Sequence, residues 1–171
     1  MHLVAFVIAS FLLPVGVAAL AWLAWRRSPW LALFGGILGV IGWLPFPALT
    51  ALDDLAVAMT RVPDGGSVGR LWDVFAFDAV MNGYLFVYII GHLLAYVLLG
   101  IALLRAAVIP RPAAVALIAS SPLMIAAWAL PGGFGSAGLG VAAVSAGLVI
   151  LGSLPAALGV LRHTGRGMMS G

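Results

Sequence analysis

Residues 75–105 read FAFDAVMNGYLFVYIIGHLLAYVLLGIALLR, the longest apolar run of the chain that also contains polar side chains. As a helix, this run is long enough to cross the ~30 Å hydrocarbon core of a bilayer. At 100° per residue, four of its side chains fall within roughly 40° of one line: Asp78, Tyr88, His92 and Tyr96. Ionisable groups inside a membrane usually face protein, water or a ligand, because lipid solvates them poorly. The run therefore predicts a membrane helix with one polar stripe.

The composition extends this interpretation to the whole chain. Of 171 residues, 64% are hydrophobic and 8% are charged, and the mean hydropathy is +1.22. Because a soluble domain carries about 25% charged residues, the sequence indicates a polytopic membrane protein. Cysteine, lysine and glutamate are absent, which excludes disulfides, thiolate metal sites, Schiff-base chemistry and a P-loop. The pI near 10.2 is attributed to arginines that set topology, and no nucleic-acid partner is expected.

The pattern predicts a single all-α transmembrane domain, a bundle of five spans. Apolar runs separated by arginine, proline or glycine-rich turns place the spans at about 3–25, 30–47, 75–104, 113–130 and 136–161. Between spans two and three lies segment 48–74. Its residues 48–61 have apolar side chains at helical spacing with Asp53 and Asp54 opposite, which predicts an amphipathic helix lying on the membrane. A solvated extension of the second span is the alternative.

The arginines predict the orientation of the bundle. With the N-terminus outside, six arginines lie on the cytoplasmic side: Arg26, Arg27, Arg105, Arg111, Arg162 and Arg166. Only Arg61 and Arg70 then lie outside, on the same side as all five aspartates. An excess of arginine on the cytoplasmic side is the positive-inside rule. We therefore expect the N-terminus and segment 48–74 outside and the C-terminus in the cytoplasm.

Two spans carry faces of small residues. The first face contains Gly35, Gly39 and Gly42, and the second contains Gly138, Ala142 and Ala146. Small side chains let helix backbones approach closely in a membrane. These faces are expected to pack within the bundle or against a partner.

His92 is the only histidine far from a chain end, and it lies about 18 Å from the cytoplasmic end of its span. Met124 has a similar depth in the next, antiparallel span, so the two side chains suit the axial ligands of a haem. His2 is another candidate for the second ligand. The alternative is that His92 hydrogen-bonds Ser120, Ser121 or a backbone carbonyl while Met124 fills space.

The polar stripe is also a candidate ligand-binding site. Asp78 and Asn82, four residues apart, are placed to line a cavity at the start of the third span, followed along the stripe by Tyr88, His92 and Tyr96. The alternative is that Asp78 and the other aspartates solvate the outer rim and pair with arginine. No catalytic set emerges, because an orienting acid is missing near the mid-membrane serines.

The stretch GHLLAYVLLGIALLR followed by VIPRPAAVALIASSPL, within residues 91–123, resembles small uncharacterised polytopic bacterial inner-membrane proteins. Proteins of this kind often carry a histidine at the position of Met124, so the chain departs from them there. The resemblance implies a multi-pass bundle in the bacterial cytoplasmic membrane. It brings no activity and no site.

These observations predict a non-enzymatic membrane protein that acts by binding, as a subunit of a membrane complex or as a receptor for a small apolar ligand. One alternative is a haem-binding or redox protein that uses His92. Another is a small proton or cation transporter that uses Asp78, Asn82 and His92. The expected partners are the lipid bilayer and either other membrane subunits or further copies of the chain.

Overall fold

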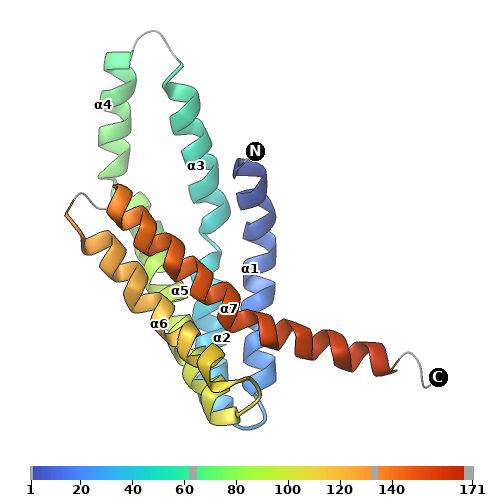
Figure 1. Ribbon diagram of the computed structural model, residues 1–171. Helices are drawn as coiled ribbons and strands as arrows, with labels where there is room; N and C mark the ends of the chain where they lie inside the picture. The colour runs from blue at the N-terminus through green and yellow to red at the C-terminus, as the bar shows by residue number, and fades with distance from the viewer. Residues whose placement is uncertain (1, 62–64, 132–134, 168–171) are drawn as a thin grey trace.

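A computed structural model describes the backbone of residues 2–61, 65–131 and 135–167, and the side chains of residues 4–61, 66–131 and 135–159. Within these residues the secondary structure is entirely helical. In chain order the helices are α1 (His2–Ala24), α2 (Pro29–Trp43), α3 (Phe46–Met59), α4 (Gly65–Ala76), α5 (Ala79–Ala106), α6 (Arg111–Ala129) and α7 (Ser136–Gly167) (Figure 1).

Five helical segments are long and apolar enough to cross a membrane. They are Val4–Ala24, Pro29–Met59, Ala79–Ala106, Arg111–Ala129 and Ser136–Gly159. The second segment joins α2 and α3 across the short break at residues 44–45. In the described part of the chain, the prediction of an all-α bundle with five helical segments able to cross a membrane is confirmed.

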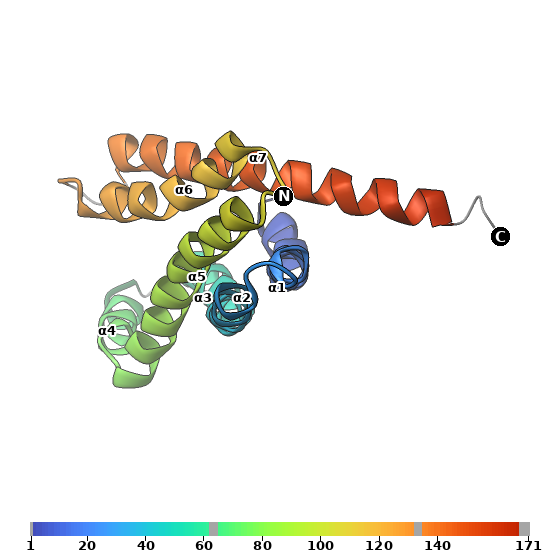
Figure 2. The ribbon, with the colours of Figure 1, turned by 90° about the horizontal axis from the view of Figure 1, so that it is seen from below.

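Helix α5 is the centre of the bundle. It packs against α2 on one side and α6 on the other, while α1 packs on α2 and α7 packs on α6. Seen from below, α6 and α7 form a pair on one side of α5, and α1 and α2 lie on the other (Figure 2). The most deeply buried large side chains, Leu99 and Leu103 of α5 and Leu117 of α6, lie in the core between these helices.

The glycine face of α2 packs inside the bundle. Gly35, Gly39 and Gly42 are all buried, and a Cβ added to Gly39 would lie 3.0 Å from the Cβ of Ala95 on α5. Of the packing alternatives for the second span, contact within the bundle is therefore the one observed. Small residues allow this close contact. Close packing matters here because helices in lipid gain no hydrophobic free energy from associating.

The small-residue face of α7 differs from the prediction. Gly138 is buried, but the buried line continues through Ser145, Gly152 and Ala156, while Ala146 is exposed. Gly138, Ser145 and Gly152 recur every seven residues, the spacing of a helix that packs lengthwise along a neighbour. The four-residue spacing used in the sequence analysis follows a different face.

The third span begins later than predicted. Helix α4 ends at Ala76 and Asp78 is extended, with φ −66° and ψ 141°, so α5 begins at Ala79 and not at residue 75. The Asp78 carboxylate caps the N-terminus of α5 by accepting hydrogen bonds from the backbone N–H groups of Val80 (2.8 Å) and Met81 (3.3 Å). Since Asp78 lies outside the helix, the helical stripe starts after it.

Helix α3 continues in the direction of α2 and rises past the start of α1, and α4 folds back beside it (Figure 1). Phe6 of α1 and Phe46, the first residue of α3, make a T-shaped contact with ring centroids 6.0 Å apart. This contact attaches the start of α3 to α1. This arrangement matches the extension considered as the alternative for residues 48–61, and not a helix that lies across the end of the bundle.

Two arginine-containing turns meet at the opposite end of the molecule (Figure 1). Arg27, in the α1–α2 turn, donates a hydrogen bond from Nη1 to the carbonyl oxygen of Ala106 at 3.3 Å, where α5 ends. Ala107 then adopts a left-handed conformation, with φ 52°, that terminates α5. A cation at a helix C-terminus satisfies carbonyls that have no helical partner.

Candidate functional site

Five ring side chains surround one another where α2, α3 and α5 meet: Trp43, Phe46, Tyr88, His92 and Tyr96. We call them the aromatic cluster. The centroid of the His92 ring lies 4.9 Å from that of Trp43 and 4.5 Å from that of Tyr88. The angles between the ring planes are 37° and 35°. The Tyr96 ring meets His92 edge-on at 6.4 Å. Offset and edge-to-face pairs of this kind are favourable beyond the area they bury.

Two local features of the sequence build the cluster. Tyr88, His92 and Tyr96 are spaced by four residues, which places them on one face of α5. On α2, the close contact of Gly42 with Gly91 brings the next residue, Trp43, against His92. Phe46 opens α3 just after the break and stacks on Tyr88, with centroids 5.7 Å apart and planes at 13°.

The hydrogen bond of His92 determines its tautomer. Nδ1 contacts the backbone carbonyl oxygen of Tyr88, one helical turn earlier. Because a carbonyl can only accept, Nδ1 carries the proton, and Nε2 of the neutral ring presents a lone pair. The interpretation that His92 bonds a backbone carbonyl is confirmed. It leaves Nε2 able to accept a hydrogen bond or to ligate a metal.

The nearby serines have carbonyl partners of their own. Ser121 Oγ donates to the carbonyl oxygen of Leu93 on α5 (2.7 Å), and Ser145 Oγ on α7 donates to that of Ser120 on α6 (2.8 Å). Ser120 Oγ donates to the carbonyl oxygen of Leu117 at 2.7 Å. The hydroxyls of Ser121 and Ser145 thus link α5 to α6 and α6 to α7 beside the cluster, and interhelical hydrogen bonds of this kind stabilise helix packing in a membrane.

Two adjoining cavities open next to the cluster, and we refer to them together as the His92 cavity. We call the one bordered by the buried Ser120 and Ser145 the inner cavity, with a volume of about 230 Å³, and the one bordered by the exposed Trp128 and Leu139 the outer cavity, with a volume of about 510 Å³. Both are lined by Tyr88, His92, Leu93 and Met124. The inner cavity reaches Trp43, Tyr96 and Ser145, whereas the outer one is walled by apolar side chains that include Leu85, Trp128 and Leu139. Tyr96, Ser120 and Ser145 line only the inner cavity, whereas Tyr88 and His92 line both.

Three of the predicted binding residues come together, and two do not. Tyr88, His92 and Tyr96 line the cavity with Met124. Asp78 and Asn82 are exposed at the start of α5; Asn82 Nδ2 donates to the carbonyl oxygens of Asp78 (2.9 Å) and Ala76 (3.3 Å). Asn82 precedes His92 by ten residues, or about 15 Å along the helix.

Sequence reasoning missed Trp43 and Phe46. Trp43 is not among the predicted site residues, yet it is 8% exposed and lies in the core. Its position directly after the last glycine of the α2 packing face was the available signal. In the described part of the chain, the buried Trp43 Nε1 has no acceptor in hydrogen-bonding geometry, although the Tyr96 phenol is close enough to interact with it.

Metal binding through carboxylates has no support in this region. Among the residues with described side chains, no three of His, Cys, Asp or Glu gather in a group that fits a metal ion. The side chain of His2 lies outside the described residues.

Comparison with protein-family models, curated proteins and solved structures gave no match. The chemistry of the site therefore rests on its own residues.

Proposed function

We propose that this protein is a non-enzymatic membrane receptor that binds a small, mostly apolar molecule in the His92 cavity. The observation that carries the proposal is the position of His92. Its side chain is 6% exposed, its Nδ1 is held by its own helix, and it lines both halves of the cavity. A buried histidine with one nitrogen oriented and the other available is a recognition group.

The geometry indicates the chemistry of the ligand. Nε2 accepts, so the ligand carries a hydroxyl or N–H donor at the end that lies against His92. Rings of the cluster favour a flat, unsaturated head group, because aromatic faces stack. The outer cavity, with Leu85, Trp128 and Leu139, suits an apolar body or tail. Its volume of about 510 Å³ lies within the ~300–1,000 Å³ range of small-molecule pockets.

A pair of adjacent substitutions on α7 tests this proposal. Ala142 lines the outer cavity, so Ala142→Trp fills it and is expected to abolish retention of the His92-cavity ligand, while phospholipid bound elsewhere is unaffected. The matched control is Ala143→Trp, at an exposed neighbouring position, and it should retain that ligand. The measurement is mass spectrometry of organic extracts from the gently purified proteins. Equal extracts from both variants, or none from the unaltered protein, would contradict the proposal.

Haem binding is the second candidate, and it rests on one observation. His92 and Met124 line the same two cavities, so the imidazole and thioether predicted as axial ligands share one space. The test is the absorption spectrum of the protein expressed with ample haem. A Soret band that disappears in His92→Ala would establish haem, and a colourless protein would exclude it.

The orientation is part of the proposal: N-terminus outside and C-terminus cytoplasmic, in the bacterial cytoplasmic membrane. It is supported by the arginines at the turns that follow α1 and α5, and by aspartates on α3, on α4 and at the start of α5. Since the chain has no cysteine, single cysteines report sidedness cleanly. A membrane-impermeant maleimide should label Thr60→Cys in intact spheroplasts, and Val108→Cys only after lysis. The reverse pattern would contradict this orientation.

A further inference from the structure

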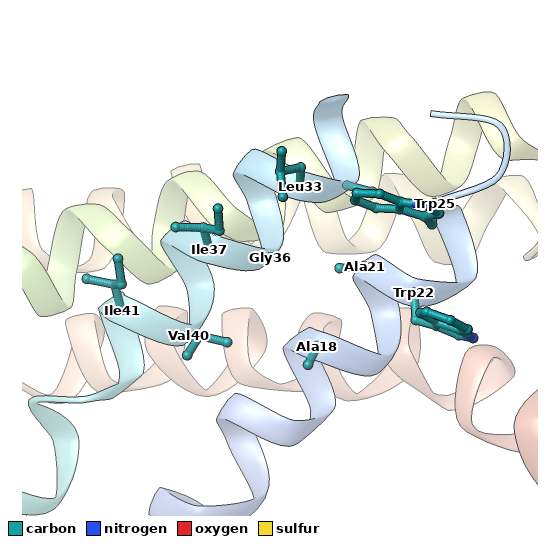
Figure 3. Close-up of a pocket in the computed structure, with 10 residues that line it drawn as sticks. Ala18, Ala21, Trp22, Trp25, Leu33, Gly36, Ile37, Val40 and Ile41 are labelled. Carbon is teal, nitrogen blue, oxygen red and sulfur yellow. The ribbon is translucent and has the colours of Figure 1, made fainter. Parts of the chain in front are cut away.

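A second hollow lies on the outside of the bundle, between α1 and α2 (Figure 3). It is a groove of about 400 Å³, separate from the His92 cavity. Its floor is made of small residues, Ala18, Ala21 and Gly36, and Trp22 and Trp25 stand beside it toward the α1–α2 turn (Figure 3). Trp22 is 78% exposed. The groove is therefore open to the surroundings of the bundle.

The close contact of α1 with α2 produces this shape. A Cβ added to Gly36 would lie 2.9 Å from the Cβ of Ala21, so the two helices touch through their smallest side chains. Larger side chains on either side of this contact, such as Trp25 and Ile37, form the walls. The result is an apolar trough between the two helices, lined by no charged group.

A positive charge with no partner among the described residues lies in the α1–α2 turn, directly after Trp25 of the trough. Arg26 follows Trp25 in the α1–α2 turn, is exposed, and makes no hydrogen bond or ion pair with the described residues. Its neighbour Arg27 is committed to the carbonyl oxygen of Ala106. The described carboxylates belong to α3, α4 and the start of α5, toward the other end of the molecule, so none of them neutralises Arg26.

We propose that this groove binds one anionic phospholipid, with an acyl chain over the Ala18–Gly36 floor and the phosphate at Arg26. Three features agree on this occupant. The trough is apolar along its length, tryptophan favours the level where lipid head groups begin, and juxtamembrane arginine attracts anionic head groups. An apolar helix from another protein chain would fill the trough but would bring no negative charge to Arg26. The site is independent of the His92 cavity.

The test uses native mass spectrometry of the full chain released from micelles that contain phosphatidylglycerol or phosphatidylcholine. The unaltered protein should retain one phosphatidylglycerol and should lose phosphatidylcholine more readily. Arg26→Gln should weaken phosphatidylglycerol retention about fivefold, the contribution of one arginine near a charged lipid surface. Ala18→Phe should abolish retention, because it fills the trough from an exposed position.

Two control variants make the result specific. Arg111→Gln removes an arginine from the neighbouring turn, and Ala19→Phe adds the same ring at an exposed position outside the groove. Both should retain phosphatidylglycerol as the unaltered protein does. The melting temperature of each variant, with and without the lipid, checks folding. Equal retention in all variants, equal retention of both lipids, or a change of oligomeric state in Ala18→Phe with lipid retention intact would overturn the proposal.

Discussion

Gly42 of α2 and Gly91 of α5 meet backbone to backbone. A Cβ added to Gly91 would lie 2.6 Å from the Cα of Gly42, and one added to Gly42 would lie 2.6 Å from the carbonyl carbon of Gly91. The residues that follow them, Trp43 and His92, are in ring contact at 4.9 Å. This backbone-to-backbone contact thus lies one residue away from the proposed recognition group.

This contact predicts a joint effect on stability and binding. Gly42→Ala or Gly91→Ala should separate α2 from α5 and lower the free energy of unfolding by about 1–3 kcal/mol, the usual effect of overpacking. Ligand retention should fall as well, because Trp43 moves away from His92. Unfolding in detergent and mass spectrometry of extracts measure the two effects.

The control for these variants lies in the same helix. Gly83 of α5 has open space around its Cα, so Gly83→Ala should leave binding unchanged and raise stability by about 0.5–1 kcal/mol. If Gly91→Ala behaved like Gly83→Ala, the close contact would have no part in holding the cluster.

Asp78 provides a second prediction, because its carboxylate caps α5. Asp78→Ala should lower the free energy of unfolding by about 1 kcal/mol, the typical loss on removing an N-cap. Asp78→Ser should restore most of that stability, since serine also caps. Both variants should bind the ligand of the His92 cavity normally. Loss of binding in a stable Asp78→Ser protein would instead place Asp78 in the binding site, as the sequence predicts.

The backbone conformation of Ala107 leads us to predict a stabilising substitution at this position. It is the one non-glycine residue in the described chain with positive φ, at 52°, a conformation that costs an L-residue roughly 1–2 kcal/mol. Because glycine avoids that penalty, Ala107→Gly should raise stability by about 1 kcal/mol. Ala107→Val should lower it. Thermal unfolding in one detergent compares the three proteins, and a less stable Ala107→Gly would contradict the left-handed assignment.

The sequence predicted the parts of the fold that depend on local pattern. Five apolar segments and the helical class follow from hydropathy, and the packing of Gly35, Gly39 and Gly42 follows from residue size. The start of α5 was misplaced because the apolar run from residue 75 hides the cap at Asp78. The α7 face was misplaced because several small residues made more than one register plausible.

The site was predictable only in part, for a similar reason. The four-residue spacing of Tyr88, His92 and Tyr96 identified one wall of the cavity from a single helix. The opposite wall, Trp43, belongs to a helix more than forty residues earlier in the chain. Its proximity depends on the register of α2 against α5, which the Gly42–Gly91 contact sets. Single-helix periodicity contains no information on that register.

The most direct measurement of the central claim is the small-molecule content of the protein purified gently from its native membrane, by absorption and native mass spectrometry. Besides the phospholipid of the α1–α2 groove, the account predicts one mostly apolar molecule with a hydroxyl or N–H donor per chain. It should be lost in His92→Phe, which keeps a ring without the acceptor, and partly retained in His92→Gln, which restores one. An empty cavity in the unaltered protein, or equal retention in His92→Phe, would contradict the claim that His92 recognises a ligand.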